Sequence, residues 1–510
     1  MKRFSLALVA AGLLGLAVGL TPSVQAEAAD QLRVGFVDPP QGFDPALAVV
    51  GASHQVIDLL FSGLTKLDAN SDPQPDLAES WTVSDDGTVY TFKLREGVKW
   101  HDGQPLTADD VVFTFERLMD PKTGYPYATQ VESFAGVKAI DPTTVELTLS
   151  KPTGPLLTFL AFPGNFIVPK HIVSAGPSLT SAPIGTGPYK FVSYSPNQEL
   201  ILGKNPDYYV SGVPKMDLQI KYINNDTERT NAMLGGNLDI ATRTAPRDYD
   251  QIVNTPGFRG SQTFGGRWYS VLTNVDADVT KNKLVRQAIS YAIDRQAMAD
   301  VLFFGYAEPM LGGPIPNWSW AHDASTDIFP VNGDVEKAKA LLAEAGYPDG
   351  VTIDMTLAAS WKNLVEQGPL LKEMLAKAGI EVNLISMENP RWVDEVWVGG
   401  KYQTANNFWL SPLADPDDFI FLSYKCGSGM NAQRYCNKEF DALVEEARYT
   451  SDQAKRKELY TQATNILLDE MPLIPTVNAG ILDAATDKVQ GWVPMRTGMY
   501  RGLENVTLAE

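Results

Sequence analysis

The sequence predicts a mixed α/β protein made of two or three lobes, and three observations support this. The 510 residues exceed what one hydrophobic core usually serves. The N-terminal half is rich in short stretches with the apolar alternation of β-strands. After residue 334, predicted helices and strands follow each other in turn, which is typical of parallel strand pairing in an α/β lobe. No serine-rich linker, repeat or low-complexity tract occurs in the sequence, so we expect ordered crossings between lobes.

The clearest local pattern in the N-terminal half is a β-hairpin followed by a capped helix. Residues 80–94 alternate about Asp86-Gly87, a dipeptide typical of tight turns. Thr107 precedes Asp110 by three residues, the spacing of a capping box, and an apolar stripe at helical spacing follows. The other elements predicted here are strands at 32–37, 145–149, 189–194, 199–202 and 218–223, a helix at 227–234 and a strand at 239–241.

The second half predicts helices and strands in alternation. Asp334 is placed to cap a helix that ends at Gly346, and a strand at 351–357 follows. The next predicted elements are a helix at 364–378, a strand at 380–385, and helices at 438–448 and 453–468.

The first 26 residues have the composition of a secretory signal peptide. Lys2 and Arg3 form the positive region, residues 6–20 the apolar region, and Val24-Gln25-Ala26 the cleavage site. The apolar run is short for a membrane-spanning helix, and no cysteine follows it for lipid attachment. We therefore expect a mature chain of 484 residues (510 minus 26), exported to the periplasm of a Gram-negative cell.

The net charge argues against two classes of partner. The formal charge is −19, and removal of Lys2 and Arg3 with the signal peptide makes it −21. Nucleic acids and anionic membranes bind basic surfaces, so we expect this chain to bind neither.

The two cysteines, Cys426 and Cys436, are expected to form a disulfide. Disulfides persist in an oxidising compartment, and closing this short loop would stabilise the chain by roughly 3 kcal/mol. Two free thiols or half a metal site are the alternatives, but all four histidines lie more than a hundred residues upstream.

Four blocks of sequence, in order, carry a resemblance to a known family. They are the hairpin and helix at 80–118, the loop Pro183-Ile-Gly-Thr-Gly-Pro-Tyr189, the helix at 284–295 with Arg286-Gln-Ala, and the helix at 334–347. These blocks resemble the periplasmic peptide-binding proteins that supply ABC importers, and the match runs from about Val34 to Pro475. That group takes dipeptides, oligopeptides, nickel complexes, haem or oligosaccharides.

The resemblance implies how the lobes are assembled. After the signal peptide (1–26), lobe I covers 27–271 and carries an inserted subdomain at about 64–182. Lobe II covers 272–475, and residues 476–510 return to lobe I. Two strands then cross between the lobes, near 268–274 and near 473–478, and form a hinge that lets the lobes close on a ligand.

The resemblance also places the best candidate site at 406–419. In relatives, the stretch around a tryptophan runs extended along the ligand, and peptides pair with its backbone as an added strand. Trp409 corresponds to that tryptophan, Phe408 and Asn407 precede it, and Asp415 begins the turn that follows. The alternative is a core strand followed by an exposed turn.

Other candidates depend on weaker patterns. In relatives, a loop like 37–42 lies at the cleft edge, so Asp38 and Pro40 are candidates, with an ordinary turn as the alternative. Trp361 could stack on a ligand, although tryptophans more often lie in the core. The glycines of the 183–189 loop lack the spacing of a phosphate-binding loop and predict a tight turn.

The sequence departs from the dipeptide-binding pattern at two charged positions. Relatives place an aspartate for the ligand ammonium three residues after the tryptophan, where this chain has Pro412. They place an arginine for the ligand carboxylate early in the helix that here starts near Leu364, where this chain has Val365 and Glu366. Asp415 can replace the first partner by a small shift, and no obvious residue replaces the second. Because an unpaired buried charge is costly, we do not expect a standard dipeptide pocket. Longer or blocked peptides, sugar derivatives, and a cationic solute facing Glu366 and Asp415 are the open alternatives.

The expected function is therefore the solute-binding receptor of an ABC importer for peptides or peptide-like solutes. We expect a monomer without catalytic residues, cofactor or metal that delivers its solute to the permease subunits. A secreted hydrolase with paired carboxylates, such as a glycoside hydrolase, is the alternative of another class. The 61 acidic residues make accidental pairs easy to find, and neither a Gly-x-Ser-x-Gly nor a His-Glu-x-x-His motif occurs.

Overall fold

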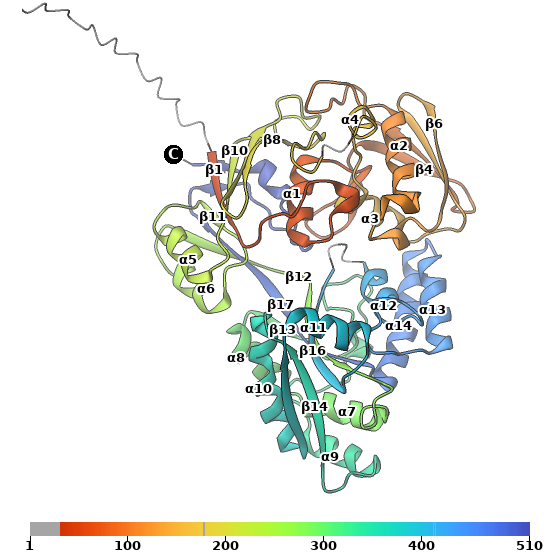
Figure 1. The fold of residues 1–510 in the computed structure, drawn as a ribbon, viewed down its shortest axis with the longest axis vertical. Helices are drawn as coiled ribbons and strands as arrows, with labels where there is room; N and C mark the ends of the chain where they lie inside the picture. Colours follow the sequence, from red (N-terminus) through yellow and green to blue (C-terminus); the bar gives the residue numbers. More distant parts are fainter. Residues whose placement is uncertain (1–30, 177–178, 412, 414, 510) are drawn as a thin grey trace, which may run out of the picture.

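The structure is a computed structural model that describes residues 31–176, 179–411, 413 and 415–509. Two lobes are joined by long strands (Figure 1). The predicted signal peptide, residues 1–26, and Pro412 lie outside the described residues. In the described part, none of the helices combines the length and the apolar character that crossing a membrane requires. The two-lobed α/β fold expected from the sequence is confirmed.

One sheet extends through both lobes. Its strands are β1 (Gln31–Phe36), β8 (Tyr189–Ser195), β9 (Glu199–Lys204), β10 (Asp217–Tyr222), β11 (Ile240–Ala241), β12 (Phe258–Thr273), β13 (Ala307–Pro309), β14 (Val351–Ala358), β15 (Ile380–Met387), β16 (Thr404–Leu410) and β17 (Leu473–Thr486). Within the described residues the strand order is β15-β14-β16-β12-β17-β11-β1-β10-β9-β8, and β13 pairs with β17.

The long strands β12 and β17 connect the lobes (Figure 1). They pair antiparallel over most of their length, with register shifts between Phe264 and Trp268 and directly after Trp268. Residues 267–273 of β12 also pair with β16 of lobe II. At its other end, β17 pairs with β11 of lobe I through Ala484 and Ala485. Both connecting strands thus belong to one ladder, whose register is irregular on either side of Trp268.

Lobe I is built on the parallel strands β10, β1 and β11, to which β9 and β8 add antiparallel. Apolar side chains alternate along β1 and β10, so that Leu32, Val34, Leu218 and Ile220 are fully buried. The helices of this lobe are α1 (Gly51–Leu60), α4 (Lys170–Val173), α5 (Asp226–Leu234) and α6 (Pro246–Val253).

The inserted subdomain contains a second sheet, made of β4 (Ala78–Val83), β5 (Val89–Leu94), β7 (Thr144–Leu149) and β6 (Phe134–Asp141) in that order, and the short pair β2 (Thr65–Leu67) and β3 (Pro73–Pro75). The predicted hairpin is confirmed, with Trp81 opposite Phe92 across the turn at Gly87. The predicted capping box between Thr107 and Asp110 begins α2 (Ala108–Met119). The helix α3 (Leu156–Leu160) completes this part.

The glycine loop at 183–189 is a packed turn, as the sequence predicts. A Cβ added at Gly185 would lie 1.9 Å from the Leu60 carbonyl oxygen, and one at Gly187 would lie 2.5 Å from the Leu60 carbonyl carbon. The Gly187 N–H donates to that Leu60 oxygen at 2.9 Å. The loop therefore needs glycine because its backbone packs directly on the end of α1.

Lobe II contains the predicted alternation of helices and strands. The strands β14 and β15 pair parallel over their full length, and α10 (Lys362–Lys377) lies between them in the chain. The Asp334 carboxylate caps α9 (Val335–Glu344) by accepting the Lys337 N–H at 2.8 Å. The other helices are α7 (Lys283–Ala292), α8 (Arg295–Phe303), α11 (Asn389–Trp392), α12 (Pro416–Tyr424), α13 (Lys438–Arg448) and α14 (Gln453–Glu470).

Cys426 and Cys436 form the disulfide that the sequence predicts. The bond closes a loop between cysteines ten residues apart, which leads from α12 into α13. The Cys426 N–H donates to the Asp441 carboxylate at 3.0 Å, so the loop is also fixed to α13.

Replacing both cysteines with serine is expected to lower the free energy of unfolding by about 3 kcal/mol, because the open loop gains conformational freedom in the unfolded chain. Urea unfolding measures this difference. Dithiothreitol provides the control: it is expected to bring the wild-type midpoint to that of the variant and to leave the variant unchanged. A variant with the wild-type midpoint would contradict the stabilising role of the bond.

Candidate ligand-binding site

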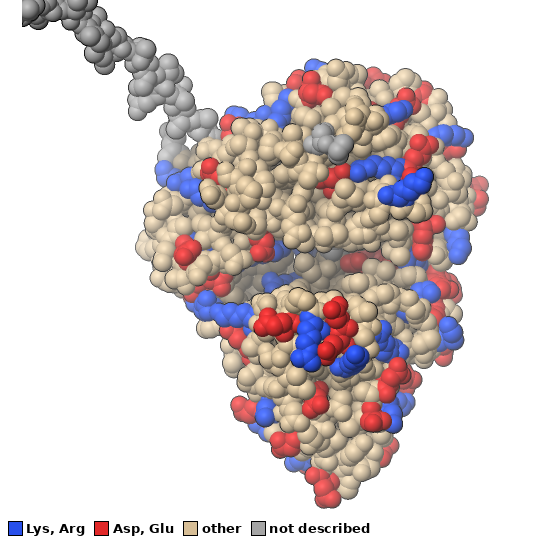
Figure 2. Space-filling view, viewed as in Figure 1, with Lys and Arg blue, Asp and Glu red and all other residues tan. Residues whose placement is uncertain are grey.

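The candidate site lies where the two lobes face each other, and Figure 2 shows the molecule hollowed along this line. On the lobe I side, the parallel strands β1 and β11 end at one edge of the sheet, the position where open α/β sheets usually bind ligands. On the lobe II side, β16 ends at Leu410, whose side chain is 41% exposed. A Cβ added at Gly51 of lobe I would lie 3.9 Å from the Leu410 Cδ2 atom, so the lobes approach each other here.

Three aromatic side chains pack together in lobe II, and we call them the aromatic group: Tyr269 is fully buried, whereas Phe408 and Trp361 are half-buried against the core of the lobe. Phe408 of β16 stands opposite Tyr269 of β12, with ring centroids 6.2 Å apart. Trp361, just before α10, meets Phe408 edge to face at 5.4 Å. The Asn363 side-chain amide donates to the Tyr269 hydroxyl at 3.0 Å and fixes the start of α10 against this group. The structure therefore brings together two of the candidates, Phe408 and Trp361.

One edge of β16 is open where it reaches the cleft. The strand pairs with β12 along its whole length, from Thr404 to Leu410. Its pairing with β14 on the other edge covers only Thr404 and Ala405. Among the described strands, none pairs with that second edge from Asn406 to Leu410. Unpaired backbone groups on a strand edge are a template for an added strand.

The side chains of Trp409 and Asn407 point to the other face of β16. Trp409 stands opposite Trp268 and is 7% exposed, and it packs in a core cluster with Phe419 and Ile420 of α12. Asn407 is 4% exposed. The Trp409 and Asn407 side chains are therefore buried on one face of β16. Phe408 and Leu410 lie on the opposite face, which carries the aromatic group.

The Asp415 carboxylate already has a cationic partner. Its oxygens face the Arg456 guanidinium of α14 at 2.7 and 3.3 Å, and both side chains are buried. The same carboxylate accepts the Asp417 N–H at 2.9 Å and so caps α12. This carboxylate is thus neutralised within the protein.

The remaining candidates, Glu366, Asp38 and Pro40, form their described polar contacts with residues outside the aromatic group. Glu366 is exposed on α10 and pairs with Lys362 at 3.8 Å. Asp38 is exposed in the loop after β1 and accepts the Asn224 side-chain amide at 3.2 Å. Pro40 is buried, and its carbonyl accepts the Tyr194 hydroxyl at 3.0 Å.

The lobes also touch at the inserted subdomain, through the end of α13. Arg448 is buried, donates to the Thr129 carbonyl oxygen at 2.7 Å, and lies 3.6 Å from the Glu132 carboxylate. The Gly154 N–H donates to the Arg448 carbonyl oxygen at 2.8 Å. Behind this contact, Leu413 packs in a small cluster with Phe159 of the subdomain. Lobe II therefore contacts lobe I through the end of α13 and through Leu413, in addition to the connecting strands β12 and β17.

Sequence reasoning missed Arg267. This half-buried residue stands on β12, and its guanidinium lies 5.5 Å from the centre of the Tyr269 ring and 5.6 Å from that of Phe408. The only signal in the sequence is an arginine next to Trp268 in a predicted lobe crossing. No pattern indicated that this position meets Phe408, because their contact depends on the pairing of β12 with β16.

Within the described residues, no group of three or more histidine, cysteine or acidic side chains is arranged to hold a metal ion.

Comparison with known proteins gives one family. The family model described as "Bacterial extracellular solute-binding proteins, family 5 Middle" matches residues 72–431. Among curated proteins, the chain is 32% identical over 490 residues to heme-binding protein A of Haemophilus influenzae, covering 89% of this chain and 88% of that protein. It is 30% identical over 474 residues to di/tripeptide-binding protein 1 of Pseudomonas aeruginosa, covering 87% of this chain and 88% of that protein.

A solved structure shares the fold over most of the chain. It is an ABC transporter-associated periplasmic binding protein of Helicobacter pylori in complex with the peptide STSA. The TM-score is 0.81 at 26% sequence identity, and the match covers 94% of this chain and 98% of that one.

Proposed function

Because this chain belongs to the family 5 bacterial extracellular solute-binding proteins, it is a binding protein and not an enzyme, and we propose that it is the periplasmic receptor of an ABC importer for peptides or peptide-like solutes. The solute enters between the lobes, the lobes close on it, and the closed form delivers it unaltered to the permease subunits. The predicted signal peptide at residues 1–26 supports the periplasmic location.

The single observation that best supports a peptide-like solute is the open edge of β16 next to the aromatic group. An extended peptide can pair with this edge through its own backbone, and backbone pairing gives affinity without requiring one side-chain sequence. Phe408 and Trp361 then provide an apolar surface beside the added strand. The peptide in the Helicobacter pylori structure and the di/tripeptide-binding relative support the same class of solute.

Titration of the purified protein with the tripeptide Ala-Ala-Ala is the direct test. We expect saturable binding of one peptide per chain, a change in the fluorescence of some of the ten tryptophans as the lobes close, and recovery of intact peptide by mass spectrometry. Cleavage of the peptide would overturn the assignment as a receptor. Absence of binding by di- to pentapeptides would overturn the peptide class of the solute.

Phe408→Ala is expected to weaken tripeptide binding about tenfold or more, which corresponds to about 1.4 kcal/mol, because the bound peptide loses the apolar surface beside the strand edge. Isothermal titration calorimetry measures the change. Phe304→Ala is the matched control, because this phenylalanine lies at the end of α8 and is 55% exposed. Equal affinities for the two variants would remove Phe408 from the site.

A further inference from the structure

Within the described residues, the Arg267 guanidinium has aromatic neighbours but no acidic or hydrogen-bonding partner. Among the described residues, its guanidinium forms neither a hydrogen bond nor an ion pair, and its Nε atom is buried without an acceptor. Its contacts are the ring faces of Tyr269 and Phe408 in the aromatic group. A charged group that is partly removed from water without a partner reduces stability, so such an arrangement needs a reason outside the folding of the chain.

Two further arginines, Arg496 and Arg243, form neither a side-chain hydrogen bond nor an ion pair with the residues that the structure describes. Arg496 lies over the Trp318 ring at 5.6 Å, and its backbone packs against β12, where a Cβ added at Gly265 would lie 1.9 Å from the Arg496 oxygen. Arg243 follows β11, and its Nη2 atom lies 3.9 Å from where a Cβ added at Gly498 would stand. The segment from Arg496 to Gly498 therefore packs against β12 at Gly265, two residues before Arg267, and also lies near the Arg243 side chain.

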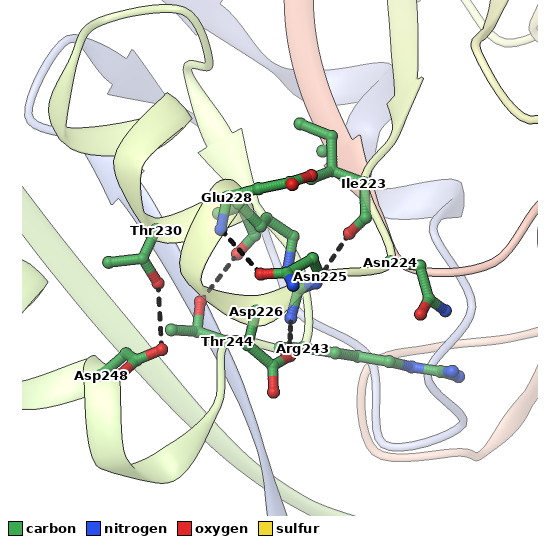
Figure 3. Close-up of polar contacts among 12 residues, drawn as sticks. Ile223, Asn224, Asn225, Asp226, Glu228, Thr230, Arg243, Thr244 and Asp248 are labelled. Carbon is green, nitrogen blue, oxygen red and sulfur yellow. Dashed lines mark hydrogen bonds and ion pairs between the residues drawn. The ribbon is translucent and has the colours of Figure 1, made fainter. Parts of the chain in front are cut away.

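The other described arginines differ from these three in having polar partners for their guanidinium groups. Every other arginine within 31–176, 179–411, 413 and 415–509 donates a side-chain hydrogen bond or forms an ion pair, including the buried Arg448, Arg456 and Arg501. In Figure 3, the Arg243 side chain extends away from Asp226 and Asp248, and no dashed line reaches its guanidinium. The Asp483 carboxylate accepts the backbone N–H of Arg243 at 2.9 Å and not its guanidinium. The charges of Asp483 and Glu308 nevertheless reach Arg243 and Arg496, respectively. Arg267 is therefore the one of these three arginines that lies against the aromatic group.

We propose that the cleft recognises an acidic group of its solute and that Arg267 is the residue that binds a solute carboxylate. This inference rests on the proposed function and specifies its solute: a peptide-like molecule with a free terminal carboxylate, or with an acidic side group in its place. A guanidinium held over Tyr269 and Phe408 presents its N–H groups to a carboxylate beside the open edge of β16, and bidentate pairing would satisfy both charges when the lobes close.

The test compares the tripeptide Ala-Ala-Ala with its C-terminal amide, which differs only in lacking the terminal negative charge. With the wild-type protein, calorimetry is expected to show at least tenfold weaker binding of the amide. With Arg267→Gln, binding of the acid is expected to fall to the level of the amide, whereas binding of the amide changes less than threefold. Arg391→Gln removes an exposed arginine of lobe II and is expected to keep the wild-type preference for the acid.

Thermal unfolding of the empty proteins separates binding from folding. Arg267→Gln is expected to unfold at the wild-type temperature or above it, because the variant removes an unpaired and partly buried charge. A lower unfolding temperature together with an unchanged preference for the acid would assign Arg267 a structural role and overturn the inference.

A second measurement distinguishes the inference from the proposed function. Wild-type and Arg267→Gln proteins are exposed to a bacterial periplasmic extract, washed, and denatured, and the released small molecules are identified by mass spectrometry. An acidic solute that is retained by the wild type and lost from the variant supports Arg267 even if both tripeptides fail to bind, in which case the peptide class alone is wrong. Equal binding of acid and amide, or retention of the same acid by both proteins, overturns the inference and leaves the receptor assignment intact. A wild-type protein that binds neither tripeptide nor any extract solute overturns both.

Discussion

Replacing Arg456 with methionine is expected to lower the free energy of unfolding by about 3–5 kcal/mol, because it leaves a buried carboxylate without its cation. The Arg456 and Asp415 side chains are 6% and 5% exposed and meet at 2.7 Å. In the variant, the Asp415 carboxylate keeps the Asp417 N–H as a described donor but loses both guanidinium contacts. Urea unfolding, followed by tryptophan fluorescence, measures the loss, and Trp320 reports locally because its ring lies 5.1 Å from the guanidinium.

An exposed ion pair provides the matched control. Arg391 and Glu395 meet at 3.0 Å on the surface of lobe II, with 63% and 31% of their side chains exposed. Since exposed pairs contribute little, Arg391→Met is expected to cost less than about 1 kcal/mol. The double variant Asp415→Asn, Arg456→Met removes both charges and is expected to be more stable than Arg456→Met alone. Equal losses in the free energy of unfolding for Arg456→Met and Arg391→Met would show that the buried pair stabilises the protein no more than an exposed pair does.

The elements that local patterns determine could be predicted from the sequence. The hairpin around Gly87, the capping box at Thr107 and the helix 438–448 depend on residues close together in the chain, and all three are confirmed. The parallel pairing of β14 with β15 followed from the alternation of strand, helix and strand. Hydrophobic periodicity and turn chemistry were sufficient for these elements.

The arrangement of the site could not be predicted in the same way, because its contacts join distant parts of the chain. Trp409 and Phe408 are neighbours, yet β16 places the first in the core and the second beside Arg267. The alternation of side chains across a strand makes this split, and which face meets the cleft depends on the pairing with β12. For the same reason, the sequence did not reveal that Asp415 pairs with Arg456 of α14.

Asp418 is expected to make stability fall as the pH rises from about 4 towards 7, against the opposite contribution of the buried His54 and His101, whose pKa values burial lowers to about 4. Asp418 stands in the first turn of α12, and burial raises the pKa of its carboxyl to about 7, with the neighbouring charges of Asp417 and Asp415 acting in the same direction. A hydrogen bond with Ser411 and the charge of Arg448 act in the opposite direction but do not offset burial.

The sign follows from where the proton is held. In the unfolded chain, an aspartic acid releases its proton near pH 4, whereas folded Asp418 keeps it up to about pH 7. Between these values the folded state binds more protons than the unfolded state, so the free energy of unfolding decreases as the pH rises. This relative stabilisation is fully present at low pH and is lost as the pH passes through the folded pKa. Asp417, whose pKa burial raises to about 6, contributes a decrease of the same sign.

Asp418→Asn is therefore expected to stabilise the protein by about 4 kcal/mol at pH 8 and to change little at about pH 4, because a shift of one pKa unit corresponds to about 1.4 kcal/mol and asparagine resembles the protonated acid. Urea unfolding across this pH range measures both differences. The slope that remains in the variant combines the raised pKa values of Asp417 and Asp483 with the lowered pKa values of His54 and His101. Asp109→Asn is the control, since Asp109 occupies the first turn of α2 but is exposed, and its stability curve is expected to run parallel to that of the wild type. If the Asp418→Asn curve also runs parallel to the wild type, the buried carboxyl is ionised throughout, and the pH dependence must arise elsewhere in the fold.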